Sequence, residues 1–212
     1  WKRTLLISVL VTVACLLLGF PVAYLLATLP LRYSNLLMIC VLMPFWTSLL
    51  VRIVAWMIML QQQGVVNDTL VWAGLVGDES RLEMMYNFTG TIIVMTQVLL
   101  PFMILPIYSV MKGISPSYMR AAQTLGAPPM EAFVKVYVPQ TMPGIGAGVL
   151  LVFIVAIGYF ITPELVGGKD GQMIGNFVAY HLRTTLNWGL AAAMGVILLG
   201  MILFFYWMYD RI

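Results

Sequence analysis

The sequence predicts an all-α membrane protein, a polytopic bundle of helices that forms one domain over residues 1–212. Composition is the first observation behind this prediction: 62% of the residues are hydrophobic, 9% are charged, and the mean hydropathy is +0.98. A soluble domain carries about 25% charged residues, so this chain could not cover a water-facing surface and must contact membrane lipids. Its net charge of +3 is small and dispersed, which argues against a nucleic-acid partner.

The second observation is a set of apolar segments that are long enough to cross a bilayer. A spanning helix needs about 20 mostly apolar residues. The segments that qualify are residues 5–29, 36–60, 91–111, 144–162 and 189–209. Arg52 is the single charge inside them. Proline or glycine interrupts several segments, which is common in transporters, where neighbouring helices or a water-lined cavity satisfy the freed backbone groups.

The charges of the connecting segments predict the topology. Residues 112–143 are basic and residues 61–90 are acidic, so the positive-inside rule places the former in the cytoplasm and the latter outside. Counting back through the spans places residue 1 outside, where the same rule disfavours Lys2 and Arg3. We therefore expect one more span upstream, which would set the orientation and remove this conflict.

The two outer connections are expected to carry short helices. Asn67 would cap a helix that runs to about Leu75, and residues 172–183 would form a second, mostly apolar helix. Both are expected to lie at the membrane interface or to line an outer vestibule.

The third observation is the absence of catalytic motifs. The nearest approach to a phosphate-binding loop is Gly168-Lys169, but Asp170 stands where Ser or Thr is needed and Pro163 replaces the leading glycine. The sequence has no HExxH, CxxC or nucleophile-elbow motif, and its single histidine excludes a histidine-cluster metal site. We therefore expect no enzyme and no metal or cofactor site in this chain.

The cytoplasmic connection is predicted to form two short helices at an angle. Ser115 is a suitable N-cap, with Pro116 at the first helical position. Gly126 is well placed for the left-handed residue that ends a helix. The small Ala121-Ala122 face would let a partner's groove approach closely, so we interpret this hairpin as a docking element. The alternative is a solvated hairpin loop with no partner.

The second of these helices opens at Pro128-Pro129 and is expected to reach Val138, just before Pro139. The whole stretch keeps one spacing: Ala121-Ala122, three residues, Gly126, nine residues, Val136-x-Val138-Pro139. This spacing resembles the cytoplasmic loop signature of permease subunits of binding-protein-dependent ABC importers, which runs Glu-Ala-Ala, three residues, Gly, nine residues, Ile-x-Leu-Pro. Arg120 departs from that signature, because it stands where the family has glutamate.

Three further stretches resemble the polyamine branch of this family, the spermidine and putrescine importers: residues 42–57, 99–114 and 156–168. The resemblance implies a MetI-like permease fold in a bacterial inner membrane. It also implies a second, homologous permease, two ATP-binding subunits that carry ATP and magnesium, and a periplasmic or lipid-anchored substrate-binding protein. Residues 116–139, with Arg120, Ala121, Ala122, Gly126 and Pro139, would couple the ATPase subunits to a switch between inward- and outward-facing states.

Candidate substrate residues follow from chemistry within and beside the spans. Arg52 lies about 8 residues, or roughly 12 Å, from the outer end of its span. We favour a structural or gating role for it over substrate contact, including an ion pair with Glu164. Tyr159 and Glu164 are better suited to hold a cation, because carboxylates and aromatic faces bind ammonium groups. Three further positions, for which packing is favoured over substrate contact, are Trp46, Gln97 and Tyr108.

Other functions remain open at this point. Within the importer class, the solute could be an amino-acid derivative, an opine or an organophosphonate. A stand-alone secondary transporter would need an inverted repeat and carboxylates within the spans, and the sequence shows neither. An intramembrane enzyme would need a set of catalytic residues, and the sequence shows no such set.

Overall fold

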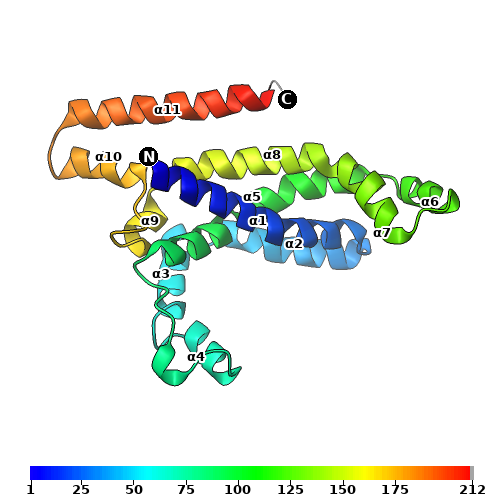
Figure 1. Ribbon diagram of the computed structural model, residues 1–212, viewed down its shortest axis with the longest axis horizontal. Coiled ribbons are helices and arrows are strands. Elements are labelled where there is room, and N and C mark those ends of the chain that lie inside the picture. Colours follow the sequence, from blue (N-terminus) through cyan, green and yellow to red (C-terminus); the bar gives the residue numbers. More distant parts are fainter. Residues whose placement is uncertain (211–212) are drawn as a thin grey trace. The chain divides into compact units, whose positions relative to one another are not determined.

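The structure, a computed structural model, describes residues 1–210, and within this range every regular element is a helix. The elements, labelled in Figure 1, are α1 (Lys2–Thr28), α2 (Leu31–Trp46), α3 (Leu49–Met59), α4 (Val65–Trp72), the 3₁₀ turn η1 (Asp78–Ser80), α5 (Phe88–Gly113), α6 (Pro116–Thr124), α7 (Pro129–Ala132), the π-helix η2 (Phe133–Tyr137), α8 (Val138–Ile157), α9 (Ile161–Val166), α10 (Ile174–Arg183) and α11 (Trp188–Asp210).

Apolar helices of membrane-spanning length dominate the described residues. Four helical runs meet this criterion: Lys2–Thr28, Phe88–Gly113, Pro129–Ile157 and Trp188–Trp207. The first has 27 residues, or about 40 Å, against a hydrocarbon core about 30 Å thick. The pair α2 and α3 brings the number to five if the two are counted as one broken span. The predicted all-α membrane protein is confirmed.

Two predicted spans differ from the observed helices. Residues 36–60 are not continuous: the helix ends at Trp46 and resumes at Leu49, with a bend of 101°. Ser48 takes an extended conformation there (φ −58°, ψ 133°), and Pro44 has already removed one backbone donor. The span predicted at residues 144–162 ends at Ile157. There the amide of Tyr159 closes a tight turn on the Ala156 carbonyl at 3.1 Å, so Tyr159 lies beyond the helix.

The described residues divide into two compact units, which we treat separately. The first, which contains the predicted coupling helices and which we call the coupling unit, comprises residues 13–44 and 99–152. The second, which we call the acidic-loop unit, comprises residues 1–12, 45–98 and 153 onward. The helices α1, α5 and α8 each contribute one end to each unit.

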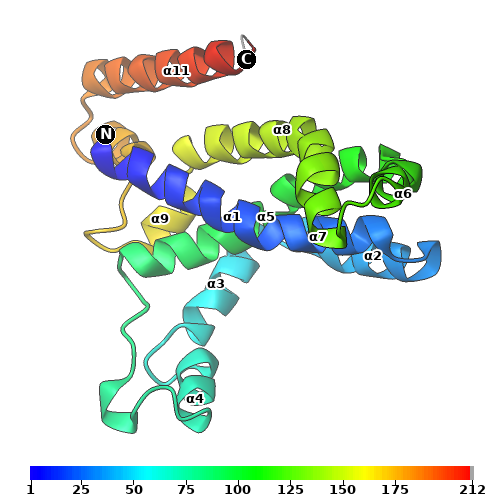
Figure 2. The same cartoon turned by 45° about the vertical axis from the view of Figure 1, so that its right-hand side comes forward.

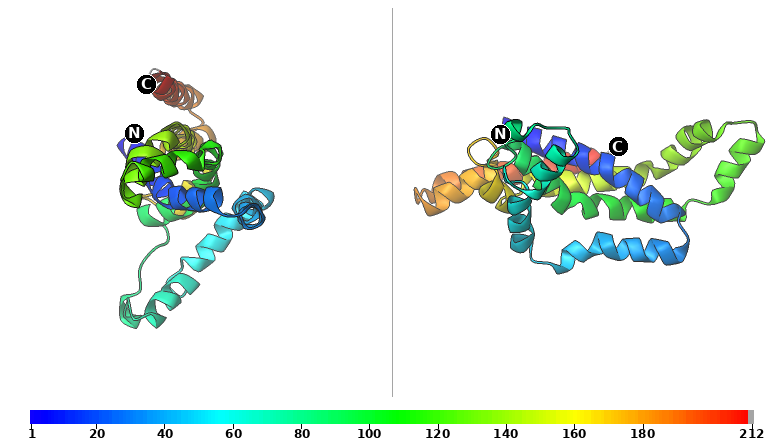
Figure 3. Two further views of the ribbon diagram at one scale, coloured as in Figure 1. Left: turned by 90° about the vertical axis from the view of Figure 1, so that its right-hand side faces the viewer. Right: turned by 90° about the horizontal axis from the view of Figure 1, so that it is seen from below.

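Small residues let helices pack closely within the coupling unit. A Cβ added at Gly19 of α1 would lie 3.1 Å from Met103 of α5, and one at Gly148 of α8 would lie 2.9 Å from the same side chain. Such contacts are typical of helix packing in membranes. The buried Ser34 hydroxyl of α2 donates to the Leu26 carbonyl of α1 at 2.7 Å. From this packed part, α5 continues into the α6–α7 hairpin, which extends outward and returns as α8 (Figure 3).

The acidic-loop unit has an apolar core of its own. It is built by buried residues of α3, α5, α9 and the loop between α3 and α5: Ile53, Leu60, Met84, Val94, Val98 and Val166. From this core, α3 leads into the loop that carries α4, and the chain then returns to the start of α5 (Figure 2). The loop is therefore anchored at both ends.

Asn67 does not cap a helix, contrary to the prediction. It lies inside α4 and is wholly buried, and the N-cap is Gly64. Only glycine fits there, because a Cβ at residue 64 would lie 2.5 Å from the Met59 carbonyl oxygen. The helix ends at Trp72, three residues short of the expected Leu75.

The start of α1 is tied to the segment before α10. Arg3 donates to the Lys169 carbonyl at 3.0 Å and lies 3.4 Å from the Asp170 carboxylate. The Thr4 hydroxyl accepts from the Ile174 amide at 2.9 Å. The positive-inside rule disfavours Arg3 on the outer side, but these partners give its charge a local carboxylate and carbonyl.

The last two helices differ in how much of their surface is covered. α10 matches the second predicted outer helix, and Asn176 in its first turn accepts from the Met173 amide at 2.9 Å. Only 6% of the most apolar 18-residue stretch of α11 is buried, although Phe205 packs edge-to-face on Phe153 with 5.0 Å between the ring centres. Most of α11 is therefore left to face lipid or another protein.

Candidate functional site

The first coupling helix, α6, forms as its sequence predicts. The Ser115 side chain accepts from the Ser117 amide at 3.4 Å, and Pro116 occupies the first helical position. Proline costs nothing there, because that amide has no partner within the helix. None of the α6 residues is buried, so the helix is held by its caps and leaves its sides open.

Gly126 ends this helix with a left-handed conformation, at φ +92°. The turn satisfies carbonyls of the last helical turn: the amide of Gly126 donates to Gln123 at 3.0 Å, and that of Ala127 donates to Ala122 at 3.1 Å. Nothing lies within 4 Å of a Cβ added at Gly126. Glycine is therefore required here by the backbone angle and not by crowding.

The second coupling helix does not stop before Pro139, contrary to the prediction. One turn of α7 passes into the π-helix of residues 133–137 and then directly into α8, whose second residue is Pro139. The Val138 amide donates to Phe133, five residues back. Proline has no amide to donate, and the extra residue of a π-turn lets the helix continue through this gap.

An aromatic cluster fixes the π-turn to α1 within the coupling unit. Tyr24 of α1 packs edge-to-face on Phe133 at 5.3 Å and on Tyr137 at 5.5 Å, and the last two rings stack on each other at 5.5 Å. These are favourable aromatic geometries. The α6–α7 hairpin is thus continuous with α8 through the π-turn and in contact with α1 through Tyr24.

The residues of the predicted signature lie on the open side of the hairpin. Arg120, Ala121, Gly126 and Pro139 are exposed, and Ala122 is half-buried. Among the side chains of residues 1–207, Arg120 has no ion-pair partner. Leu125 is 90% exposed and Met130 is 74% exposed. This surface of small, apolar and cationic side chains is a suitable docking face for another subunit.

Glu164 lines a cavity of about 510 Å³ formed by α9 and α10. Its carboxylate accepts a hydrogen bond from Asn176 at 2.6 Å, and the same amide group donates to the Phe160 carbonyl at 3.2 Å. The residues around the cavity are Glu164, Gln172, Asn176, Phe177, Ala179, Tyr180, His181, Arg183 and Thr184. The carboxylate is thus positioned by a second side chain beside two aromatic rings.

Sequence reasoning missed two residues of this cavity. Asn176 lies in the first turn of α10, among mostly apolar residues. Arg183, at the end of the same helix, lies over the Phe160 ring at 5.6 Å from its centre. A polar side chain in the first turn of a short apolar helix was the available signal for Asn176. The sequence held no comparable signal for the contact of Arg183.

Arg52 and Tyr159 come close together in the acidic-loop unit, within electrostatic range of each other. Tyr159 also packs against the core cluster of that unit. The suggested ion pair of Arg52 with Glu164 does not occur in the described residues, since Glu164 is bonded to Asn176 instead. The Arg52 Nε and the Gln97 Oε1 are buried and have no hydrogen-bond partner among residues 1–207.

The remaining pathway candidates are placed differently. Trp46, at the end of α2, is 80% exposed, so it is not a packed core residue in this chain alone. Tyr108 of α5 is half-buried and belongs to the coupling unit, whereas the other five candidates belong to the acidic-loop unit.

Comparison with known proteins identifies the family. Residues 16–212 match the family described as the binding-protein-dependent transport system inner membrane component. The chain is 35% identical to the spermidine/putrescine transport system permease protein PotB of Escherichia coli (strain K12), over 99% of this chain and 77% of PotB. It is 34% identical to the inner membrane ABC transporter permease protein YdcU of the same organism, over 92% of this chain and 65% of YdcU.

Two solved structures of bacterial alginate ABC transporters share the fold. One, involved in import of the acidic polysaccharide alginate, has a TM-score of 0.65 at 20% identity and covers 100% of this chain and 79% of its own. The other, in complex with an alginate pentasaccharide-bound periplasmic protein, has a TM-score of 0.71 at 20% identity and covers 99% and 78%. Such permeases work with a substrate-binding protein and with a separate ATPase subunit. The chain belongs to this family: it is a multi-pass inner-membrane permease subunit of a binding-protein-dependent ABC importer, and not an enzyme.

Proposed function

We propose that this permease pairs with a second permease to form the pathway of a polyamine importer, with spermidine and putrescine as substrates. The observation that carries the proposal is the 35% identity to PotB over 99% of the chain. Because the match covers nearly every helix, it includes the loops and spans that surround the pathway.

The cavity at Glu164 supports a cationic substrate. A polyamine is a chain of ammonium groups separated by short apolar links. It would therefore bind well to a carboxylate beside aromatic rings. Glu164 supplies the carboxylate and Asn176 holds it in place, while Phe177 and Tyr180 supply the rings. Tyr159 lies in the break that follows α8, and Arg52 is near it. We assign Arg52 a gating role, because a guanidinium repels ammonium groups.

The coupling hairpin would link transport to ATP hydrolysis. In this proposal two ATPase subunits, which carry ATP and magnesium, engage the face formed by Ala121, Ala122 and Gly126. Their closure pulls on residues 116–139, and the π-turn passes the movement to α8. The pathway then changes between outward- and inward-facing states, as a two-state element biased from a distant site.

A binding measurement on the cognate substrate-binding protein tests the substrate. We expect calorimetric titration to show tight binding of spermidine or putrescine. The complete transporter in liposomes should then take up the same compound only when ATP and the binding protein are both present. Tight binding of an unrelated solute, with no response to polyamines, would contradict the proposal.

An amino-acid derivative is the second candidate, and one observation favours it. Arg183 lines the same cavity as Glu164, and a cavity with both a guanidinium and a carboxylate suits a ligand that carries both a carboxylate and an amine. The two substrates respond differently to Arg183→Gln. Transport of a zwitterion should fall, whereas transport of a polyamine should be unchanged or improved.

A further inference from the structure

Arg52 is the single charged residue inside the predicted spans, and nothing in the described part of this chain balances its charge. It lies in α3, which makes the broken span together with α2. Among the side chains of residues 1–207, Arg52 has no ion-pair partner, and its buried Nε has no hydrogen-bond partner. A guanidinium stays charged at physiological pH. Such a charge within a span therefore costs free energy until an anion lies beside it.

Tyr159 and Thr162 bring two hydroxyl groups to this part of the acidic-loop unit. The Tyr159 phenol lies within electrostatic range of the Arg52 guanidinium and close to the Thr162 side chain. Thr162 is wholly buried, and its hydroxyl oxygen has no hydrogen-bond partner among residues 1–207. The carboxylate of α9, Glu164, is bonded to Asn176 instead. Hydroxyl groups and a guanidinium can all donate to the oxygens of one anion, so this set suits a carboxylate that the described residues do not supply.

The helix α3 has an open row of apolar side chains beside Arg52. Val51, Ala55 and Met59 are exposed, and their spacing of four residues puts them on one stripe of the helix. Arg52 and Trp56 form the neighbouring stripe, which is half-buried. Arg52 therefore lies at the border between the core of the unit and the open row, where another molecule can reach it.

The charge of Arg52 indicates what covers the open row. Lipid acyl chains would leave the guanidinium without a counter-ion, which is costly within a span. An apolar protein surface that carries one carboxylate is complementary, because a carboxylate accepts two parallel hydrogen bonds from a guanidinium. A second copy of this chain is a poor source of that group, since no Asp or Glu lies inside the five predicted spans. Glu164, just beyond the fourth span, is already held by Asn176.

We propose that Arg52 forms an ion pair with an Asp or Glu in a membrane span of the second permease. The row of Val51, Ala55 and Met59 packs against the same span, and the hydroxyl groups of Tyr159 and Thr162 stabilise the carboxylate. The proposal rests on the permease pair of the proposed function, but not on a polyamine as the solute. It also gives the gate in which we place Arg52 its second half.

Charge exchange in the complete transporter, reconstituted in liposomes with its binding protein, tests the ion pair. Arg52→Glu places two carboxylates together and should lower transport about 100-fold, whereas Arg52→Lys keeps the charge and should lower it less. Each Asp or Glu in the spans of the second permease is then changed to Arg in the Arg52→Glu background. One of these exchanges should restore transport to within about 3-fold of the wild type. Arg32→Glu, at an exposed arginine in the first turn of α2, is the matched control and should gain nothing from that exchange.

A disulfide experiment tests the same contact without transport, so it also covers variants that are inactive. Cys15 and Cys40 of this chain and any cysteines of the other subunits are first replaced. Arg52→Cys is then combined with Cys at each acidic position in the spans of the second permease. We expect one combination to form a cross-link between the two permeases under mild oxidation.

The other outcomes separate this inference from the proposed function. If the two permeases co-purify but no exchange restores Arg52→Glu and no cross-link forms, the ion pair is overturned and the permease pair stands. If no second permease co-purifies with this chain, both are overturned. A cross-link from Arg52→Cys to Glu164→Cys of a second copy would assign the partner carboxylate to this chain and would overturn the proposal. Transport that depends on anionic lipid in the wild type, and loses this dependence in Arg52→Gln, would assign Arg52 to a lipid phosphate and would also overturn it.

Discussion

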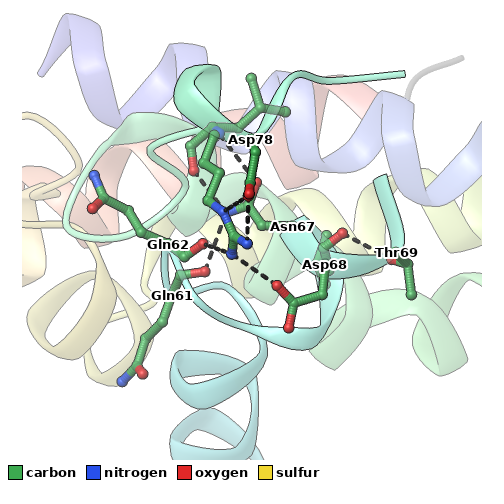
Figure 4. A network of polar contacts seen from close by, with 9 residues as sticks. Gln61, Gln62, Asn67, Asp68, Thr69 and Asp78 are labelled. Atoms are coloured by element: carbon green, nitrogen blue, oxygen red, sulfur yellow. Dashed lines mark hydrogen bonds and ion pairs between the residues drawn. The ribbon is translucent and has the colours of Figure 1, made fainter. Parts of the chain in front are cut away.

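The acidic loop, residues 61–87, and the coupling hairpin are held in different ways. In the loop, side chains bridge positions that are distant in sequence, such as Asn67 with Leu82 and Arg81 with Asp68 (Figure 4). In residues 115–137, the side-chain hydrogen bonds and ion pairs span at most four residues, as in the Ser115 cap and the Glu131–Lys135 ion pair. Distant bridges give a loop one global shape, whereas local contacts fix only the helices and leave the angle between them free.

This difference fits the role that we propose for the hairpin. A hairpin that moves with the ATPase subunits needs helices that can change their angle, and this one connects to α8 and α1 through the π-turn and Tyr24. Its exposed Leu125 and Met130 would gain packing only in the assembled transporter. Residues 61–87, by contrast, keep one shape without a partner, so any binding there would lose little conformational entropy.

Among the changes that we consider, loss of the Asn67 side chain, which bridges the two ends of the acidic loop, should have the largest effect. Asn67→Ala removes three hydrogen bonds, to the amide and carbonyl of Leu82 and to the Gln61 carbonyl, although the Gln61 carbonyl keeps its bond from the Gly64 amide. At about 1 kcal/mol for each bond, the loss costs about 3 kcal/mol. Hydrogen exchange of residues 61–87 should then speed up about 100-fold, until the loop is as loosely held as the coupling hairpin. Thr69→Ala, an exposed position on the same helix, is the control and should change exchange little. Unchanged protection in Asn67→Ala would show that the loop is fixed by other contacts.

Breaking the turn of the coupling hairpin should have the next largest effect. Gly126→Pro cannot adopt φ +92° and loses the amide that donates to Gln123, so the two coupling helices are set at a wrong angle. We expect ATP hydrolysis to persist while transport per ATP falls about 10-fold or more, since a misplaced element is costly to coupled function. Gly113→Ala is the matched control, because a Cβ there has open space and Gly113 is not among the positive-φ residues. A normal ratio of transport to hydrolysis in Gly126→Pro would mean that the hairpin is not the coupling element.

Local features of both segments could be read from the sequence, and distant ones could not. The Ser115 cap and the Gly126 turn were predictable because each depends on one residue and its immediate neighbours. The presence of several apolar helices of spanning length followed from composition, whereas the 101° bend within residues 36–60 did not. The role of Asn67 was misjudged, since its partner Leu82 lies 15 residues away and no local pattern marks that pairing.

The candidate site shows the same limit. Glu164 and Tyr159 were proposed from their chemistry, but the support of Glu164 by Asn176 crosses 12 residues and two helices. Pro139 was expected to end a helix, because proline usually does. The π-turn before it depends on how Phe133 and Tyr137 pack on Tyr24, which the sequence alone does not specify.

Weakening the aromatic link between the hairpin and α1 should have a moderate effect. Tyr24→Leu removes two edge-to-face contacts, each worth about 0.5–1.5 kcal/mol, but keeps an apolar side chain in place. Transport per ATP should fall about 3-fold to 10-fold, less than in Gly126→Pro. Tyr33→Leu, at an exposed tyrosine of α2, controls for the loss of a ring. Equal transport in the two variants would show that Tyr24 does not take part in coupling.

Reversing the charge of Arg120 should have the smallest effect and would sharpen what the hairpin gains from its partner. Arg120 is exposed, has no ion-pair partner among the side chains of residues 1–207 and stands where the family signature has glutamate. We expect it to pair with an acidic residue of the ATPase or of a neighbouring loop. Exposed ion pairs contribute about 0.2–1 kcal/mol, so Arg120→Glu should slow transport about 2-fold to 5-fold, and Arg120→Gln should slow it less. The difference between the two variants should shrink at high ionic strength, because salt screens exposed charges. Full activity and normal assembly of Arg120→Glu would mean that the pairing has no role and that the small residues beside it carry the docking alone.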